Sequence, residues 1–287
     1  MSEARILLTR ASRPSTFDVT AVDEHGVLRD VAVAGEHPLT LYVDKQEILT
    51  LMTLGAAPEA LAIGYLRNQR LVERIDDIVA VQVDWETHSV AVKTRNGLAD
   101  LEAKTAKRTK TSGCGQGTMF GDLMEDIDSV RLPAGVSLTQ SALYALLDKV
   151  RLHETIYKQA GAVHGCALAS NDGDNSDILM FVEDVGRHNA VDAIAGQMWL
   201  DGEDGVDKVF YTTGRLTSEM VIKAAQMRIP FLVSRSGLTQ MGYEIAEKVD
   251  MTMIGRATNR HYLLFTGAHR FRADAATPPP PRRVPAS

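Results

Sequence analysis

Cysteine is scarce in this sequence: its 287 residues include only Cys114 and Cys166. Two thiols are too few for a disulfide framework or for a zinc site built from cysteines. Long apolar runs are also missing. No stretch approaches the roughly 18 residues of a membrane span, and the N-terminal MSEARILLTR lacks the apolar core of a secretory signal. We therefore expect a cytoplasmic protein, not bound to a membrane, whose cysteines stay thiols.

Positive charge is in deficit, because the formal net charge is −6. A general nucleic-acid binder needs surplus Lys and Arg to neutralise phosphates, so we expect no nucleic-acid partner. The G-x-G-x-x-G and Walker A loops are absent as well, which excludes a dinucleotide or ATP in its usual cradle. A local basic pocket for one phosphorylated ligand remains compatible with this composition.

The ligand set of a zinc deaminase is incomplete. Such a site needs H-x-E and P-C-x-x-C. Here His164, Gly165 and Cys166 lie in a strand-like stretch, and no C-x-x-C follows. We predict a core thiol at Cys166, no metal site and no tightly bound zinc.

The order of elements predicts an α/β fold. The segment before the first cysteine reads as mostly β, with strands at 39–44, 79–86 and 89–94 and one helix that begins near Pro58. Further on, strands at 162–170, 178–184, 208–214, 231–237, 251–255 and 261–267 alternate with helices, the first of them opened by a capping box of Ser137 and Gln140. This alternation predicts a mostly parallel sheet with helices on both faces, preceded by a smaller β-rich domain. The predicted divisions are a β-rich N-terminal domain at 1–112, a glycine-rich cysteine loop and linker at 113–135, an α/β domain at 136–270, and a proline-rich disordered tail at 271–287.

Cys114 is the candidate reactive residue. Glycines at 113, 115 and 117 leave its thiol unshielded, and three basic residues just upstream, Lys107, Arg108 and Lys110, favour the thiolate. The alternative is a small buried hydrophobe, as most lone cysteines are. Spacing alone does not separate the two interpretations.

Polar residues recur where predicted strands give way to helices, at 184–190, 212–219 and 234–239. Hydroxyls, a bare backbone and a guanidinium beside a helix N-terminus suit a phosphate group. One such junction is usually a helix cap with a solvated arginine, but three at one sheet edge favour a ligand site. Its candidate residues are Arg187, His188, Asn189, Thr213, Gly214, Arg215 and Ser218. The later segment GRATNRH, with Arg256, Asn259, Arg260 and His261, is either a clamp for an anionic or purine group or an exposed basic turn.

Several stretches resemble one known family, the formate dehydrogenase accessory sulfurtransferases (FdhD). VEDVGRHNAVD (182–192) and TTGRLTSEMVIKAA (212–225) resemble its most distinctive segments. HPLTLYVDKQEILTLMTLGAAPEALAIGYLRNQRLV (37–72) resembles its N-terminal signature, and SGCGQGTMF (112–120) matches its sulfur-carrying loop. The resemblance covers roughly residues 35–270.

The resemblance implies a sulfurtransferase with a cysteine persulfide intermediate, for which Cys114 is the matching position. Sulfur would pass from a cysteine desulfurase to the molybdenum cofactor in its bis(molybdopterin guanine dinucleotide) form, for use by the formate dehydrogenase catalytic subunit. It further implies a homodimer, a C-terminal domain similar to cytidine deaminase without its zinc, and a cofactor-binding segment. In this sequence that segment is Arg256, Ala257, Thr258, Asn259, Arg260 and His261.

One departure from the family pattern concerns the cysteine loop. Many members carry C-x-x-C there, whereas this sequence has Cys114-Gly115-Gln116-Gly117. A single thiol can still hold a persulfide, but its terminal sulfur must then leave without a neighbouring resolving thiol. The leading alternative is a non-catalytic chaperone that binds the cofactor and delivers it to the apo-dehydrogenase. A deaminase-like hydrolase is disfavoured by the missing zinc ligands.

Overall fold

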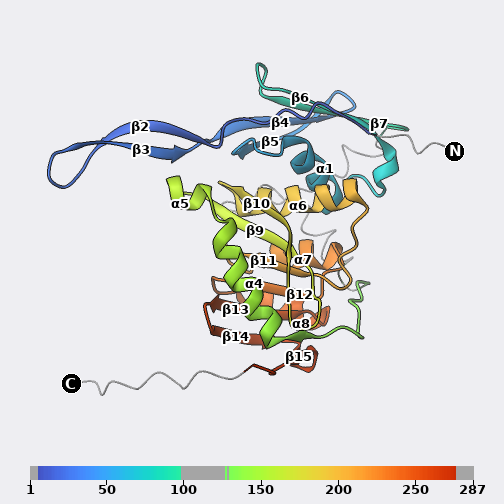
Figure 1. The fold of residues 1–287 in the computed structure, drawn as a ribbon. Coiled ribbons are helices and arrows are strands. Elements are labelled where there is room, and N and C mark those ends of the chain that lie inside the picture. The colour runs from blue at the N-terminus through green and yellow to red at the C-terminus, as the bar shows by residue number, and fades with distance from the viewer. Residues whose placement is uncertain (1–5, 98–126, 128, 276–287) are drawn as a thin grey trace.

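Two main sheets, one above the other in Figure 1, organise the chain. The computed structural model describes residues 6–97, 127 and 129–275. The upper, five-stranded sheet has the order β1-β6-β7-β4-β5 and the lower, six-stranded sheet the order β10-β9-β11-β12-β13-β14. Among the described residues, no helix is both long and apolar enough to cross a membrane.

The N-terminal sheet alternates buried and exposed side chains, as the sequence pattern predicts for strands with one covered face. Its strands are β1 (Leu7–Leu8), β4 (His37–Val43), β5 (Gln46–Thr53), β6 (Ile78–Asp84) and β7 (Ser89–Thr94). Helix α1 (Pro58–Asn68) covers the inner face and begins at Pro58, as predicted. Strand β5 was not predicted separately, and η1 (Ile75–Asp77) leads into β6.

The C-terminal sheet is α/β in class, as predicted, but it is mixed rather than mostly parallel. Its strands are β9 (His164–Ala169), β10 (Ile178–Asp184), β11 (Val209–Thr212), β12 (Phe231–Ser234), β13 (Thr252–Thr258) and β14 (His261–Thr266). Only the central trio β11-β12-β13 is parallel, because helices connect those strands. Strand β10 pairs antiparallel with β9, β9 with β11, and β14 with β13. Short loops join β9 to β10 and β13 to β14, and a short connection can only return the chain antiparallel.

Helices cover both faces of this sheet, as predicted. Apolar side chains of α6 (Arg187–Asp201), α7 (Ser218–Gln226) and α8 (Gln240–Lys248) pack in one core cluster. Helix α4 (Gln140–His153) packs on the opposite face, and the short α5 (Ile156–Ala160) follows it. Helix α6 also supplies Ala193, Trp199 and Leu200 to the core of the N-terminal sheet, so it lies between the two sheets.

Two sequence expectations about segment ends were wrong. The capping residue of α4 is Thr139, whose hydroxyl accepts from the backbone N–H of Ala142, so the predicted box of Ser137 and Gln140 does not form. The disordered tail predicted for 271–287 is wrong at its start, and its residues 276–287 lie outside the described part of the chain. Strand β15 (Phe271–Arg272) pairs with β8 (Leu138–Thr139) after the turn η2 (Ala268–Arg270), and Phe271 packs in the core on the α4 face.

Strands β2 (Thr16–Val22) and β3 (Leu28–Ala34) form a separate two-stranded sheet. They pair antiparallel over their whole length. In Figure 1 this hairpin, hereafter the arm (residues 16–34), projects sideways from the N-terminal sheet beyond the body of the protein.

Candidate functional site

The candidate site lies where the strands of the C-terminal sheet end in junctions with helices. Strand β10 leads through Gly186 into α6, β11 leads into α7, and β12 leads towards α8. The three junctions that the sequence singled out therefore share one edge of the sheet, as predicted. Ligands of open α/β sheets bind at this type of edge.

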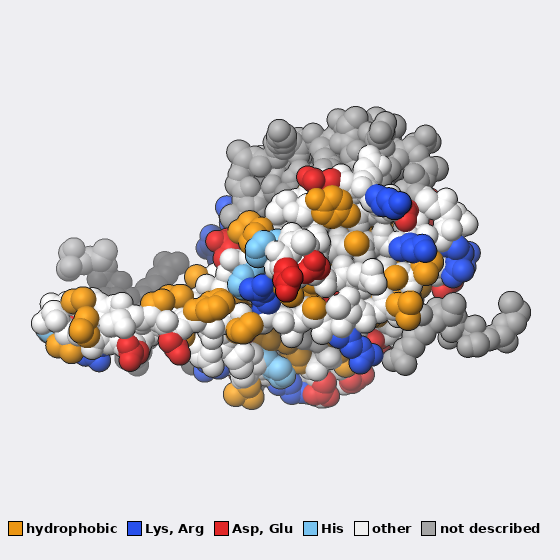
Figure 2. Space-filling model, turned by 90° about the horizontal axis from the view of Figure 1, so that it is seen from above, with side chains coloured by type: hydrophobic (Ala, Val, Ile, Leu, Met, Phe, Trp, Pro, Cys, Tyr) orange, Lys and Arg blue, Asp and Glu red, His pale blue; other side chains and the backbone are white. Residues whose placement is uncertain are grey.

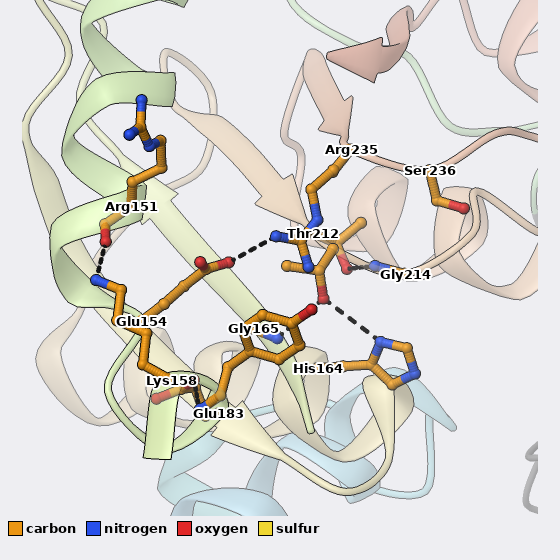
Figure 3. A network of polar contacts seen from close by, with 12 residues as sticks. Arg151, Glu154, Lys158, His164, Gly165, Glu183, Thr212, Gly214, Arg235 and Ser236 are labelled. Atoms are coloured by element: carbon orange, nitrogen blue, oxygen red, sulfur yellow. Dashed lines mark hydrogen bonds and ion pairs between the residues drawn. The ribbon is translucent and has the colours of Figure 1, made fainter. Parts of the chain in front are cut away.

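Three arginines from these junctions lie close enough to one histidine for their charges to act on it. The pKa of His164 is lowered by burial and by the charges of Arg187, Arg215 and Arg235. The Nδ1 atom of His164 lies 3.4 Å from the hydroxyl of Thr213 (Figure 3). Arginines near a histidine whose pKa is lowered give this edge of the sheet a cationic character, which suits an anion with several oxygens, such as a phosphate ester.

Arg187 reaches this cluster across Gly214. A Cβ atom built on Gly214 would lie 2.8 Å from Cδ of Arg187, so the arginine stem lies directly on the glycine backbone. The turn that follows β11 is closed by Thr212, whose hydroxyl accepts a hydrogen bond from the Gly214 N–H at 3.0 Å. The hydroxyl of Ser234 donates to the Gly214 carbonyl at 2.6 Å, which ties the second junction to the third.

The side chain of Arg235 is held in place from α4 and α5 (Figure 3). It forms an ion pair with the buried Glu154 at 3.2 Å, and its guanidinium carbon lies over the ring of Tyr157, 5.2 Å from the centroid. Helix α5 is fixed in turn by Glu183, whose carboxylate accepts from the backbone N–H groups of Ile156 and Tyr157 at 2.9 Å. This arrangement fixes Arg235 before any ligand arrives, which lowers the entropy lost on binding.

A buried polar network lies behind the cationic cluster. The ammonium of Lys223 pairs with Asp192 at 2.8 Å and with Glu219 at 3.3 Å, and Glu219 lies 3.5 Å from Nε2 of His188. Asn68 of α1 donates to the other oxygen of Asp192 at 2.7 Å. The network therefore joins α1, α6 and α7 beneath the site.

His188 is buried as a neutral imidazole. Burial is the main cause, followed by the charges of Lys223 and Arg187, and together they lower its pKa to about 2. Both ring nitrogens lack a hydrogen-bond partner among the described residues. His188 therefore keeps its capacity to donate and to accept one hydrogen bond.

We expect His188→Asn to flatten the pH dependence of stability on the acid side. In the unfolded chain the imidazole takes up a proton near pH 6.5, whereas in the folded protein its pKa is about 2. Between these values the folded state binds fewer protons, so the free energy of unfolding falls as pH falls. The slope for this one group is about 1.4 kcal/mol per pH unit. Urea denaturation from about pH 7 to about pH 5 measures it.

The comparison of wild type with His188→Asn isolates this slope. Burial raises the pKa values of Asp184 and Glu219, so these groups favour the folded state at acid pH in both proteins. Their contribution largely cancels in the difference. Parallel stability curves for the two proteins would contradict a buried neutral His188.

Asp184 and Asn189, at the end of β10 and the start of α6, anchor the site to the N-terminal sheet. Asp184 Oδ2 accepts from the hydroxyl of Thr53 at 2.5 Å and from the N–H of Leu54 at 3.1 Å. The amide of Asn189 donates to Asp184 at 2.7 Å and to the carbonyl of Met52 at 2.6 Å. The predicted ligand residue Asn189 therefore has a structural role in this state of the protein.

The structure describes one of the two cysteines, Cys166. Cys166 is fully buried, as predicted, and its thiol lies 3.3 Å from the hydroxyl of Thr212. Burial raises its pKa to about 12, which keeps it protonated and unreactive at neutral pH. Cys114 and the rest of its glycine-rich loop lie outside the described residues.

The segment 256–261 comprises the last three residues of β13, a two-residue turn and the first residue of β14. The Arg256 N–H donates to the carbonyl of Ser236, which places this backbone beside the third junction. Arg260 is engaged elsewhere, with Asp148 at 2.8 Å and over the ring of Tyr144. The structure therefore brings the start of this segment to the site, while the Arg260 side chain points to α4. The other predicted residues of this segment differ in exposure. Ala257 is buried in the core, whereas Thr258, Asn259 and His261 are exposed.

Several residues of the site were not predicted from the sequence. His164, Glu219, Lys223 and Arg235 were missed as members of one cluster. Glu219 and Lys223 lie four residues apart on α7, and this i,i+4 spacing was a usable signal. The sequence around His164 does not indicate that three arginines lie near it, because those arginines come from three other segments of the chain. No group of three or more His, Cys, Asp or Glu suited to a metal occurs within the described residues.

Comparison with known proteins identifies the family. The model of the FdhD/NarQ family matches residues 34–272. The chain belongs to the FdhD/NarQ family. Its relatives include the sulfur carrier protein FdhD of Listeria monocytogenes, 30% identical over 252 residues, which cover 86% of this chain and 95% of that protein. The sulfur carrier protein FdhD of Wolinella succinogenes is 27% identical over 238 residues, or 83% of this chain and 82% of that protein.

A solved structure shows the same fold. It is a crystal structure described as a formate dehydrogenase accessory protein from Desulfotalea psychrophila. It superposes with a TM-score of 0.72 at 24% identity and covers 90% of this chain and 100% of that chain. The FdhD/NarQ membership that the sequence motifs indicated is confirmed by the family match, and the α/β architecture by this superposition.

Proposed function

We propose that this protein is a sulfur carrier for formate dehydrogenase, with Cys114 as the sulfur-carrying thiol. A cysteine desulfurase presents a persulfide, and the Cys114 thiolate attacks its outer sulfur. The new S–S bond forms as the old one breaks, the desulfurase cysteine leaves as a thiolate, and Cys114 keeps the terminal sulfur. That sulfur then passes to the molybdenum cofactor, the substrate that the formate dehydrogenase catalytic subunit later receives. In this step the S–S bond breaks, Cys114 leaves as a thiolate, and a two-electron reductant, either the reduced substrate metal or an external thiol pair, brings the transferred sulfur to the sulfide level. We also propose that the protein acts as a homodimer, as the family resemblance implies.

The observation that supports a phosphorylated substrate is that Arg187, Arg215 and Arg235, from three junctions at one sheet edge, all lie close enough to His164 to lower its pKa. The guanine dinucleotide form of the molybdenum cofactor carries pyrophosphate groups, and guanidinium clusters bind such groups through paired charge-assisted hydrogen bonds. The first turn of α7, which begins at Ser218, supplies further donors at the same edge. The names of the relatives support the sulfur-carrying part of the proposal.

The two cysteines make the sulfur-loading experiment internally controlled. Wild type, Cys114→Ala and Cys166→Ala are incubated with a cysteine desulfurase and labelled cysteine, and peptide masses are then measured. We expect a gain of one sulfur, about 32 Da, on the Cys114 peptide of wild type and of Cys166→Ala, reversed by reductant. Cys166 should gain no sulfur, because its thiol is buried and protonated.

Activation of formate dehydrogenase in a deletion strain separates carrier from chaperone. The sulfur-carrier mechanism requires that Cys114→Ala fails to restore the dehydrogenase while Cys166→Ala restores it. Restoration by Cys114→Ala would instead favour a chaperone that binds and delivers the cofactor. In that case the arginine cluster would remain necessary and the thiol would not.

A further inference from the structure

His164 lies at one end of β9, between the first and the second junction. The register of β9 with β10 places it opposite Asp184, the last residue of β10. On the other side of β9, the Thr213 N–H donates to the carbonyl of Gly165 at 2.9 Å, so the turn after β11 lies beside the same strand end. Strand β12 pairs parallel with β11, which brings the junction at 234–239 next to this turn. The backbone therefore places His164 among the three junctions.

The hydrogen bonds of Thr213 indicate which nitrogen of His164 carries the hydrogen. The Thr213 hydroxyl oxygen accepts from the Gly165 N–H at 3.1 Å, and its own hydrogen remains to be donated. The acceptor that the described residues offer to this hydrogen is Nδ1 of His164, at 3.4 Å. A neutral imidazole that accepts at Nδ1 carries its hydrogen on Nε2. Figure 3 shows Nε2 turned away from Thr213, so the ring presents a donor on its far side.

The carboxylates around His164 already have partners. Glu154, at the end of α4, pairs with Arg235 at 3.2 Å, and Glu183 of β10 accepts from the first N–H groups of α5. Asp184 accepts from the N-terminal sheet and from the start of α6. Other titratable groups on the elements packed here are Tyr157, Tyr211, Cys166, His188, Glu219 and Lys223. The charges that lower the pKa of His164 are those of the arginines.

An anion at this edge would reverse the electrostatic balance at His164. In the free protein, burial and the charges of the three arginines lower its pKa, so the ring is neutral at neutral pH. A phosphate ester on these guanidinium groups offsets their charge and places oxygen anions next to the ring. An opposite charge within about 4–6 Å changes a pKa by about 1–3 in favour of the charged form. The pKa of His164 therefore rises when the anion binds, whereas His188, with a pKa of about 2, stays neutral.

We propose that His164 binds a pyrophosphate diester through its Nε2–H and takes up a proton as that ligand binds, so that the site holds its ligand more tightly at acid pH. This assignment rests on the proposed function, because it concerns the same substrate site. Linkage requires that a ligand whose binding takes up a proton gains affinity as pH falls. The gain lies between the pKa of His164 in the free protein and its higher pKa in the complex. Cys114 has no part in this step.

The probe is diguanosine diphosphate (GppG), in which a pyrophosphate joins two guanosines. Both phosphates are diesters, so the charge of the ligand is constant over the pH range of the test and any proton taken up belongs to the protein. Calorimetry of the full chain, in two buffers of different ionisation enthalpy, gives Kd and the number of protons taken up. We expect Kd to fall about 5- to 20-fold from about pH 7.5 to about pH 5.5, with uptake of about 0.5–0.8 proton at about pH 6.

His164→Gln keeps an amide donor but does not titrate. Its Kd for GppG should change less than about twofold over the same pH range, with no proton uptake. His25→Gln is the matched control and should behave as wild type. His25 lies at the tip of the arm with its side chain 74% exposed, and Figure 2 shows the arm projecting from the body of the protein. Circular dichroism checks that both variants fold.

Nitrogen-15 spectra of wild type labelled at histidine test the tautomer without a substitution. In the free protein at about pH 7 the His164 ring should show a bare Nδ1 and a protonated Nε2. With GppG at about pH 6 both nitrogens should be protonated in most molecules. The signals of His164 are assigned by their loss in His164→Gln.

Three results would overturn the assignment of His164 and leave the proposed function standing: a Kd for GppG that does not change with pH, proton uptake that persists in His164→Gln, or the opposite tautomer. Failure of GppG to bind at any pH would overturn this assignment together with the substrate site. Sulfur loading of Cys114, measured on the same samples, reports separately on the carrier function.

Discussion

Gly64→Ala is expected to lower the free energy of unfolding by about 4 kcal/mol or more, or to prevent folding. Helices α1 and α6 cross at Gly64 and Gly196. A Cβ atom on Gly64 would lie 1.7 Å from the carbonyl oxygen of Asp192, and one on Gly196 would lie 1.9 Å from that of Ala60. The obstructing atoms belong to the backbone of a neighbouring helix, so no side-chain rotation relieves the clash. The helices must separate, which opens the junction between the two sheets.

Gly135→Ala is the matched control. Gly135 is exposed, and a Cβ atom built there has no neighbour within 4 Å. Its effect should stay within about 0.5 kcal/mol. Urea denaturation followed by circular dichroism measures both variants, and the soluble yield reports failure to fold. A Gly64→Ala protein as stable as the control would show that the helices do not cross as closely as described.

Lys223→Met is expected to cost about 3–5 kcal/mol of stability, because it leaves buried carboxylates without their cation. Lys223 and Asp192 are 2% and 0% exposed, and burial of the lysine is offset by Asp192 and Glu219, so that its pKa is raised. Methionine has a similar shape, so little of the loss comes from a cavity. Adding Asp192→Asn to Lys223→Met should restore part of the stability, since it removes one of the stranded charges.

An exposed ion pair provides the control for Lys223→Met. Arg74 and Asp76 lie 3.0 Å apart with both side chains 72% exposed. Arg74→Met should change the free energy of unfolding by at most about 1 kcal/mol. Equal effects of Lys223→Met and Arg74→Met in urea denaturation would mean that the Lys223 network is accessible to water.

The buried network has a consequence for the site. Glu219 and His188 lie on the first turns of α7 and α6, and Asn68 connects the same network to α1. A change in Lys223 therefore reaches the base of the cationic cluster, although Lys223 itself is buried. We therefore expect a change in this set of ion pairs to alter both the stability of the protein and binding at the proposed site.

The sequence by itself determined the family, the α/β class and the edge of the sheet at which the polar junctions meet. These follow from local information: long motifs, hydrophobic periodicity and polar residues that succeed apolar runs. Burial of Cys166 followed in the same way, because its neighbours form a continuous apolar strand.

The tertiary structure decided what depends on contacts between distant segments. Loop length turned the outer strands β10 and β14 antiparallel, and Thr139 rather than Ser137 capped α4. Only folding brought Arg187, Arg215 and Arg235 near His164, because the four residues come from four separate segments. Likewise, the close approach of α1 and α6 requires two glycines far apart in the sequence, Gly64 and Gly196, to meet. Periodicity reports which face of an element is buried, whereas the identity of its neighbours is set by packing of the whole chain.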